Sequence, residues 1–318
     1  MFAQYAPQVG MSGCDAIPDS SHLFVGWANT CIVHRGYLNI DFPALGTTTS
    51  GDSSLSLGVP DRMVVSLGDS GYATLTFDGY LYNGPGADFA VFENGFANPT
   101  NDSQAFLELA FVEVSSDGEN FFRFPAQSLT NTQTQIPGSG VYMYANLIHN
   151  LAGKYIANWG TPFDLEDLAG ISGLDINRIT HVRLVDVVGD VNARHACFDS
   201  AGRTINDPFP TQFPTGGFDL DAVGAIHVHG STGITSVQQS SSTFIYPQPA
   251  GDVVSLIQQD CTNGFQYLVV SLDGRLMLEG TATTTTTQVN ISNLQSCVYS
   301  IIVKDSKGKK WVEKLVHY

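Results

Sequence analysis

Carboxylates and an amide gather in two short stretches of the chain, and these groups are ligands that calcium prefers. Asp88 and Glu93 flank the apolar run Phe-Ala-Val-Phe, and Asn94 follows directly. Asp219 and Asp221 are two positions apart, so both point to one face if this segment is a strand. Because Ca²⁺ takes about six to eight oxygen ligands, these five residues are our candidate ligands of a structural calcium ion.

The same acids have a structural alternative, in which they cap turns and pair with Arg123 or Arg183. Asp88 and Glu93 are five positions apart and point to opposite faces of a regular strand, unless the chain bends at Asn94. The sequence has no EF-hand loop pattern. Both interpretations therefore stay open. His227 and His229 could share one metal ion, but no third ligand can be named, so we favour an exposed pair at the end of a strand.

Aromatic side chains are frequent in the loop-rich segments that follow. Flat rings on loops at one end of a β-sandwich can stack against sugars or other planar ligands, whereas core packing is the structural alternative. We select four of them as candidate ligand-binding residues: Tyr142, Tyr144, Trp159 and Phe163. The further aromatic residues of this group are Tyr155, Phe209 and Phe213.

Signatures of catalysis are missing from the sequence. It contains no Gly-x-Ser-x-Gly, no His-Glu-x-x-His and no P-loop. A glycoside hydrolase needs only two suitably spaced acids, and Glu108, Glu113 and Glu166 are available, although nothing distinguishes them. We therefore predict a binding protein with no catalytic residues, and a secreted carbohydrate-active hydrolase or a structural, adhesive surface protein is the alternative.

The elements that must position these residues are mostly strands. Short alternating or β-branched runs recur between Gly, Asn and Asp turns, with a hairpin expected at Asp117-Gly118. One short helix is expected after Thr161, with Thr161 as its N-cap and Pro162 in the first turn. This pattern predicts an all-β fold: a jelly-roll-like β-sandwich over residues 4–229, followed by a small immunoglobulin-like β-sandwich.

Charge and cysteine content limit the possible partners and location. The 318 residues carry a formal net charge of −16, and residues 1–230 hold 24 acidic against 8 basic residues, which accounts for all of it. Such a surface repels phosphate backbones and anionic lipid, so a nucleic-acid partner is not expected. No apolar run is long enough to span a bilayer.

The five cysteines allow two disulfides between residues near each other in the sequence, Cys14–Cys31 and Cys261–Cys297, which would leave Cys197 without a partner. The alternative is that the thiols stay free. The start resembles a signal-peptide end, with cleavage near Gln4.

The last quarter of the chain changes in character. Residues 230–244 have almost no charge and read as a Ser/Thr/Gln-rich linker. From residue 245 the blocks Tyr-Pro-Gln-Pro-Ala-Gly-Asp, Ser-Leu-Asp-Gly-Arg, Ile-Ser-Asn-Leu and a basic final strand follow in order. Residues 245–318 thereby resemble the C-terminal sorting domain (type A) of the type IX secretion system. That resemblance implies export to the cell surface or outside a Bacteroidota-type bacterium, with the secretion machinery as partner.

The preceding segment has a resemblance of its own. Val64–Val228, with Tyr-Asn-Gly-Pro-Gly-Ala-Asp-Phe-Ala-Val-Phe-Glu-Asn-Gly-Phe, resembles an uncharacterised family of bacterial cell-surface proteins. More distantly it is similar to surface lipoproteins that accompany uptake systems, including those for cobalamin. We therefore expect the first domain to bind an extracellular ligand. The expected ligands, in order, are a glycan, another small nutrient such as a corrinoid, and a protein partner in adhesion.

Overall fold

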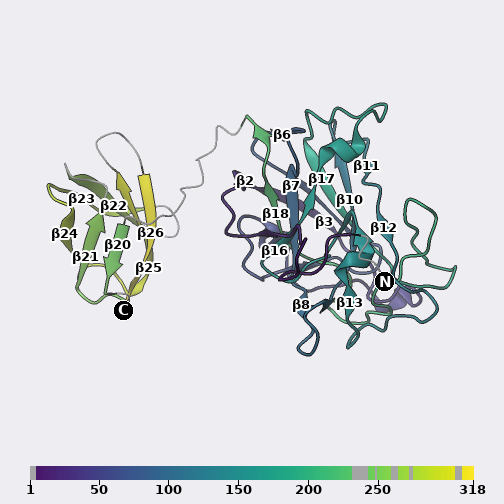
Figure 1. The fold of residues 1–318 in the computed structure, drawn as a ribbon. Coiled ribbons are helices and arrows are strands. Elements are labelled where there is room, and N and C mark those ends of the chain that lie inside the picture. The colour runs from purple at the N-terminus through teal and green to yellow at the C-terminus, as the bar shows by residue number, and fades with distance from the viewer. Residues whose placement is uncertain (1–4, 231–242, 248, 259–263, 272–274, 305–309) are drawn as a thin grey trace. The chain divides into compact units, whose positions relative to one another are not determined.

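The computed structural model of the chain describes residues 5–230, 243–247, 249–258, 264–271, 275–304 and 310–318. The chain divides into two compact units, residues 1–233 and 234–318, and each is described here by itself (Figure 1). Within the described ranges the helical segments are four short 3₁₀ turns, η1 (Pro43–Leu45), η2 (Ser53–Ser56), η3 (Ala145–Leu147) and η4 (Leu165–Leu168). None of the described helices is long and apolar enough to cross a membrane. The all-β prediction is confirmed.

Two antiparallel six-stranded sheets form the N-terminal unit. The first sheet has the order β1 (Ile17–Pro18), β16 (Trp159–Phe163), β7 (Phe89–Glu93), β18 (Asp219–Ala225), β2 (Gly26–Trp27), with β4 (Val65–Ser66) also paired to β18. The second has the order β11 (Phe122–Arg123), β10 (Ala110–Ser115), β17 (His181–Asp186), β5 (Tyr72–Thr76), β3 (Thr30–His34), with β15 (Leu151–Ala152) also paired to β10.

Three small sheets extend the unit beyond this sandwich. One joins β12 (Gln127–Ser128) to β14 (Ile148–His149), and one joins β19 (Val228–His229) to β6 (Tyr80–Leu81). The third has the order β13 (Met143–Tyr144), β9 (Gln104–Phe106), β8 (Phe96–Ala97). Strands β12 and β14 lie directly before and after the loop that forms the candidate pocket, and β13 lies within it, whereas β19 and β6 contribute no residue to the pocket lining.

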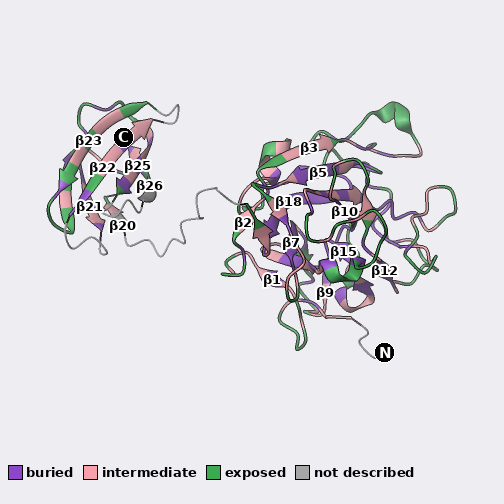
Figure 2. Ribbon diagram, turned by 90° about the horizontal axis from the view of Figure 1, so that it is seen from above, coloured by how far each residue is buried: buried purple, intermediate pink, exposed green. Residues whose placement is uncertain are grey.

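The main core lies between the two large sheets, because alternate residues of their strands point to each other. Phe89 and Val91 from the first sheet share one buried cluster with Val112 and Leu184 from the second. Strand β17 shows the alternation directly, since every second residue from Val182 to Asp186 is buried. Figure 2 shows burial concentrated on the central strands and exposure on the loops. The sandwich is therefore confirmed, and the jelly-roll strand order remains a prediction.

Local turn chemistry explains one confirmed and one wrong expectation. Strands β10 and β11 form the expected hairpin, and Gly118 in its turn has φ +81°, a left-handed conformation that favours glycine. The expected helix after Thr161 is wrong: Thr161 and Pro162 lie in β16, paired with β7. The 3₁₀ turn η4 begins later, capped by Asp164, whose carboxylate accepts the N–H of Glu166.

The C-terminal unit is a second, smaller sandwich of seven described strands. A three-stranded sheet has the order β20 (Thr243–Tyr246), β21 (Val253–Gln258), β24 (Thr286–Asn290). A four-stranded sheet has the order β23 (Leu276–Ala282), β22 (Phe265–Ser271), β25 (Cys297–Lys304), β26 (Lys310–His317). Both sheets contribute to a separate buried cluster that includes Leu256, Val269 and Ile301.

Some sequence expectations fall on residues outside this description. These are the cleavage site near Gln4, the body of the linker and Cys261. Cys14, Cys31, Cys197 and Cys297 are free cysteines, so of the two alternatives that the sequence left open for Cys14 and Cys31, free thiols rather than a disulfide are found.

Candidate functional site

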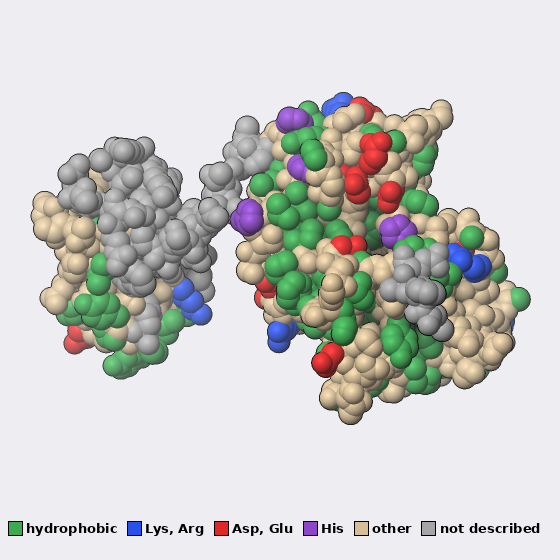
Figure 3. All heavy atoms as spheres, in the orientation of Figure 1, with side chains coloured by type: hydrophobic (Ala, Val, Ile, Leu, Met, Phe, Trp, Pro, Cys, Tyr) green, Lys and Arg blue, Asp and Glu red, His purple; other side chains and the backbone are tan. Residues whose placement is uncertain are grey.

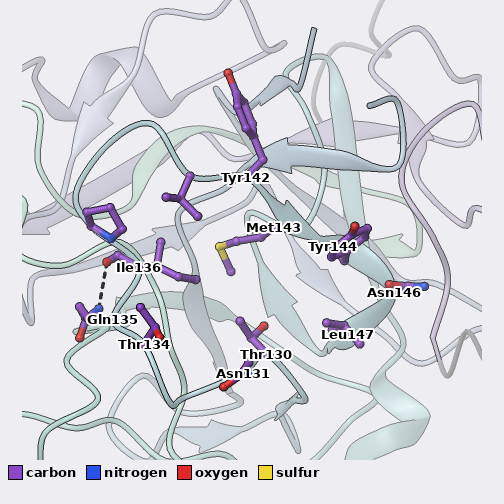
Figure 4. Close-up of a pocket in the computed structure, with 12 residues that line it drawn as sticks. Thr130, Asn131, Thr134, Gln135, Ile136, Tyr142, Met143, Tyr144, Asn146 and Leu147 are labelled. Carbon is purple, nitrogen blue, oxygen red and sulfur yellow. Dashed lines mark hydrogen bonds between the residues drawn. The ribbon is translucent and has the colours of Figure 1, made fainter. Parts of the chain in front are cut away.

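A pocket of about 690 Å³ opens between two limbs of one long loop, residues 130–137 and 141–147 (Figure 4). The second limb contains β13 and η3, which join this loop to the small sheet of β8 and β9. In Figure 4 Met143 points into the pocket, whereas the ring of Tyr142 points away from its middle. The lining residues are Thr130, Asn131, Thr134, Gln135, Ile136, Pro137, Val141, Tyr142, Met143, Tyr144, Asn146 and Leu147.

Buried amides hold the first limb in place. Asn206 is fully buried, and its Oδ1 accepts the N–H of Ile136 at 3.0 Å. Its Nδ2 donates to the carbonyl oxygens of Asn131 at 2.6 Å and Thr134 at 2.8 Å. Gln135 Nε2 donates to the carbonyl oxygen of Gly189 at 2.9 Å. These bonds fix the loop before any ligand arrives, which lowers the entropy cost of binding.

The pocket presents apolar surface together with neutral polar groups. Its twelve lining residues include no Asp, Glu, His, Lys or Arg. Tyr144 is 41% exposed, so one face of an aromatic ring is available to a ligand. The Thr130 hydroxyl is buried and has no hydrogen-bond partner among the described residues. Such a surface suits a neutral ligand that has both hydroxyl groups and apolar faces.

The four aromatic residues selected from the sequence separate into two groups. Tyr142 and Tyr144 both line the pocket. Trp159 lies in β16 opposite Pro18 and is not among the lining residues. Phe163 is 1% exposed and its ring stacks on Phe89 at a centroid distance of 5.4 Å. Phe163 is therefore a core residue that a ligand cannot reach, and the expectation of ligand contact there is wrong.

Two of the five predicted calcium ligands serve the backbone instead. The Asp88 carboxylate accepts the N–H groups of Gly84 and Leu165, each at 2.7 Å, and lies 2.6 Å from Nδ1 of His227. The Asp221 carboxylate, at a bulge in β18, accepts the N–H groups of Asp61 and Arg62, each at 3.1 Å. Both acids stabilise loops, as the turn-capping alternative proposed.

The other three predicted ligands lie together at the end of β7. Asn94 Nδ2 donates to Asp219 Oδ2 at 2.8 Å, and Asp219 also accepts the Ser66 hydroxyl. Glu93 is 2% exposed, and its Oε2 accepts the N–H of Gly95 at 2.8 Å. Burial, reinforced by the charge of Asp219, raises the pKa of Glu93 well above its usual range. Burial likewise raises the pKa of Asp219 to about 6.

Three further buried acids join this group, and sequence reasoning missed them as members of one cluster. Glu108, Asp186 and Asp207 are 8%, 3% and 3% exposed. Burial is the main cause that raises the pKa of each, for Asp186 to about 8. Their positions in the alternating pattern could have indicated that these acids are buried. Asp186 continues the buried alternation of β17, and Glu108 lies two residues before the buried Ala110. An acid in an inward-facing position is uncommon without a functional or structural reason.

Other candidate residues have ordinary partners. Glu113 pairs with Arg123 at 2.8 Å and with Arg183 at 3.8 Å, on the outer face of the second sheet. Glu166 is exposed and accepts Asn83 Nδ2 at 2.7 Å. The suggested pairing of these arginines with the candidate calcium ligands is therefore wrong.

The two histidines near the end of the unit pack on an aromatic ring. The His229 ring stacks on Tyr82 at 4.2 Å, and the His227 ring lies at 5.5 Å from the same ring. Among the residues that the structure describes, no three His, Cys, Asp or Glu side chains are placed to hold a metal ion as they stand.

Comparison with known proteins decides the role of the C-terminal unit. The sequence profile of the secretion system C-terminal sorting domain matches residues 244–317, which cover the second sandwich from the second residue of β20 to the end of β26. Residues 244–317 are a type IX sorting domain. The sorting domain directs the chain to the cell surface or the extracellular space, with the secretion machinery as its partner. The resemblance of Val64–Val228 to a surface-protein family remains a prediction.

Comparison with other proteins adds no assignment for the N-terminal unit. No curated protein matches the chain in sequence. A β-glucuronidase from Ruminococcus gnavus in complex with D-glucaro 1,5-lactone aligns with 10% identity over 78% of this chain and 36% of its own, at a TM-score of 0.24. PorZ, a surface component of the type-IX secretion system of Porphyromonas gingivalis, aligns with 10% identity over 86% and 47%, at 0.22. The chain spans less than half the length of either protein, and such scores assign neither fold nor activity.

Proposed function

We propose that the N-terminal unit captures an extracellular glycan in the pocket between residues 130–137 and 141–147, and that the sorting domain delivers it to the cell surface. One observation carries this proposal: the pocket combines an exposed tyrosine ring with amide and hydroxyl side chains and has no charged residue in its lining. A sugar ring offers an apolar face for stacking and hydroxyl groups at its edge, which this lining matches.

The absence of charge in the lining supports a neutral sugar. Residues 1–230 are strongly acidic, and Figure 3 shows acidic side chains grouped on the face of the unit in view. A glycan with carboxylate or sulfate groups would be repelled by this surface and would find no Lys or Arg in the pocket. A neutral glycan meets neither obstacle.

The lining also supports binding over hydrolysis. A glycoside hydrolase places two carboxyl groups about 5–9.5 Å apart across the scissile bond. The twelve residues around the pocket supply none. The grouped acids of this unit, such as Glu93 and Asp207, are 2% and 3% exposed, and a polysaccharide cannot reach such buried groups. Neither this pocket nor the group of buried acids therefore favours the hydrolase alternative.

The size of the pocket supports a small ligand over an adhesive protein surface. Small-molecule pockets measure about 300–1,000 Å³, and this pocket has about 690 Å³. A corrinoid is a larger, planar, amphipathic ligand and is the second candidate, because it also uses an aromatic face and hydrogen-bonding groups.

The test is a binding screen of the full chain against neutral glycans, acidic glycans and corrinoids. We expect binding of a neutral glycan, and we expect Tyr144→Ala to weaken it about tenfold, or about 1.4 kcal/mol. Phe213→Ala is the matched control, since Phe213 is 49% exposed and lies outside the pocket lining. Equal affinity of wild type and Tyr144→Ala, or turnover of the bound glycan, would contradict the proposal.

A further inference from the structure

Five buried carboxyl groups converge where the two large sheets end. In β7 the side chains of Phe89 and Val91 point into the core between the sheets, and Glu93 is the next residue on that side. In the facing sheet Asp186 ends β17 opposite Ala110. The remaining members, which complete what we call the carboxylate cluster, are Glu108, Asp207 and Asp219.

Backbone contacts place Glu108 near two other members of the carboxylate cluster: the N–H of the next residue, Leu109, donates to Asp207 at 3.1 Å, and Ala110 lies opposite Asp186. Burial, reinforced by the charges of the other four members, raises the pKa of Glu108 well above its usual range. Its own carboxyl group forms no hydrogen bond or ion pair with any described residue. No hydrogen bond from a described residue therefore fixes the direction of the Glu108 carboxyl group.

No ion pair joins a member of the carboxylate cluster to a Lys, Arg or His side chain among the described residues, although the charge of Arg35 partly opposes the rise of the Asp219 pKa. Six ion pairs occur among the described residues, and their acids are Glu113, Asp41, Asp199 and Asp88. A buried charge without a partner is costly, because the protein interior replaces little of the lost hydration. The buried acids of this cluster therefore require compensation, either by protonation or by a bound cation.

Two oxygen atoms of the carboxylate cluster also lack any hydrogen-bond partner. Glu93 Oε1 and Asp207 Oδ1 are completely buried and unbonded, whereas the second oxygen of each accepts a backbone N–H, from Gly95 at 2.8 Å and from Leu109 at 3.1 Å. By contrast, both oxygens of Asp186 and of Asp219 accept hydrogen bonds. The unbonded oxygens belong to side chains that are 2% and 3% exposed, so bulk water does not supply the missing hydrogen bonds.

Protonation alone does not satisfy these atoms. A neutral carboxyl group carries either an O–H donor or a carbonyl acceptor at the free oxygen, and each needs a hydrogen-bond partner in a dry interior. Neither Glu93 Oε1 nor Asp207 Oδ1 has one. A cation bound between the carboxylates would supply the missing contact and would also compensate the repulsion.

We propose that the carboxylate cluster binds one divalent cation of the calcium class, with Glu93, Glu108 and Asp207 as its carboxylate ligands. Asp186 and Asp219 add negative charge from their hydrogen-bonded positions, and backbone or water oxygens complete the about six to eight ligands of Ca²⁺. As no three acids among the described residues are placed around an ion as they stand, binding requires that the three carboxylates draw together. This site is separate from the glycan pocket and does not depend on the proposed function.

The test is a calorimetric titration of calcium into the full chain after treatment with a chelator. We expect one calcium ion per chain from this site, bound roughly tenfold or more weakly by Glu108→Gln, because ligand charge sets affinity at such sites. Glu119→Gln is the matched control: it makes the same chemical change at an exposed position of the β10–β11 hairpin and should bind like wild type.

Folding of the variant is checked in chelator, where Glu108→Gln should unfold at the same temperature as wild type or a higher one, since it removes a repelling charge. Glu93→Gln gives an independent second measurement of the same loss. If wild type binds no calcium at millimolar concentrations, or if all variants bind it equally, the carboxylate cluster is not a cation site.

Discussion

Lys154 is a buried lysine whose ammonium group lacks an ion-pair partner among the described residues, which is unfavourable for the stability of the folded state. It is the only lysine in residues 1–230, it is 3% exposed, and it forms no ion pair among the described residues. Its Nζ lies 5.1 Å from the centroid of the Tyr155 ring, which offers weak compensation. Burial therefore lowers the pKa of Lys154, although the charge of Asp15 opposes this effect.

Lys154→Met should stabilise the N-terminal unit at pH 7 by about 1–3 kcal/mol, because methionine fills a similar volume without the buried ammonium group. Folding lowers the pKa of Lys154 in the wild type. At pH values between that lowered pKa and about 10.4, the unfolded chain therefore binds more protons than the folded chain. Wild-type stability thus rises with pH over this window, and the advantage of the variant should shrink there. Chemical unfolding of both proteins at pH 7 and pH 10 measures the stabilisation by Lys154→Met and its decrease with pH. A variant that is less stable than wild type at pH 7 would contradict this account.

The chemistry of the site residues was visible in the sequence, but their partners were not. Glu93, Asn94 and Asp219 come together as expected. Asp88 and Asp221 are the same residue types at similar spacing, yet backbone N–H groups from residues 61–62, 84 and 165 occupy them. Most of these hydrogen bonds join segments that are more than 70 residues apart in the sequence. No local sequence pattern encodes such contacts, so the sequence alone could not show which loop would bind each carboxylate.

At the scale of elements, the loop of residues 130–137 depends on one buried amide. Asn206 forms three hydrogen bonds with this loop, through the N–H of Ile136 and the carbonyl oxygens of Asn131 and Thr134. The loop has no strand or helix of its own, so these bonds replace a regular ladder. The pocket wall is consequently only as rigid as the Asn206 anchor.

Asn206→Ala should release this wall while the two large sheets stay folded. Each lost buried hydrogen bond costs about 1 kcal/mol, and the Ile136 amide loses its acceptor outright. Hydrogen exchange should therefore become faster at Ile136, with no change at β10 and β17 in the second sheet. Unchanged protection of the Ile136 amide would show that other contacts hold the loop, and this readout does not require that the ligand be known.

The strands could be predicted where the alternation of apolar and polar residues and the residue types of the turns indicated the same structure. The β10–β11 hairpin followed from alternation and from Asp117-Gly118, whose glycine adopts φ +81° as the turn requires. The segment after Thr161 failed because its Thr-Pro-Phe start also suits an extended strand, and pairing with β7 decided the outcome. The bulge that displaces Asp221 in β18 has no signature in the sequence.

The net charge of the chain changes at the same point in the sequence at which the N-terminal unit ends and the segment with the sorting domain begins. Residues 1–230 carry the entire net charge of −16, and residues 231–318 are neutral with six acidic and six basic residues. The sorting domain was identifiable from the sequence because its motifs follow one another in a fixed order. The pocket was not, because its two limbs acquire a shape only through Asn206 and the small sheet of β13 and β9.

Removal of residues 234–318 should separate delivery from binding. Each unit has its own buried core, with no residue shared between the two clusters. The truncated chain should therefore unfold at the same temperature as the N-terminal unit within the full chain, as calorimetry can measure. In a bacterium with type IX secretion, the truncated chain should be absent from the cell surface and the medium, because it lacks the sorting domain. A lower unfolding temperature would mean that the sorting domain also stabilises its cargo, and export without residues 234–318 would mean that a second address lies in the N-terminal unit.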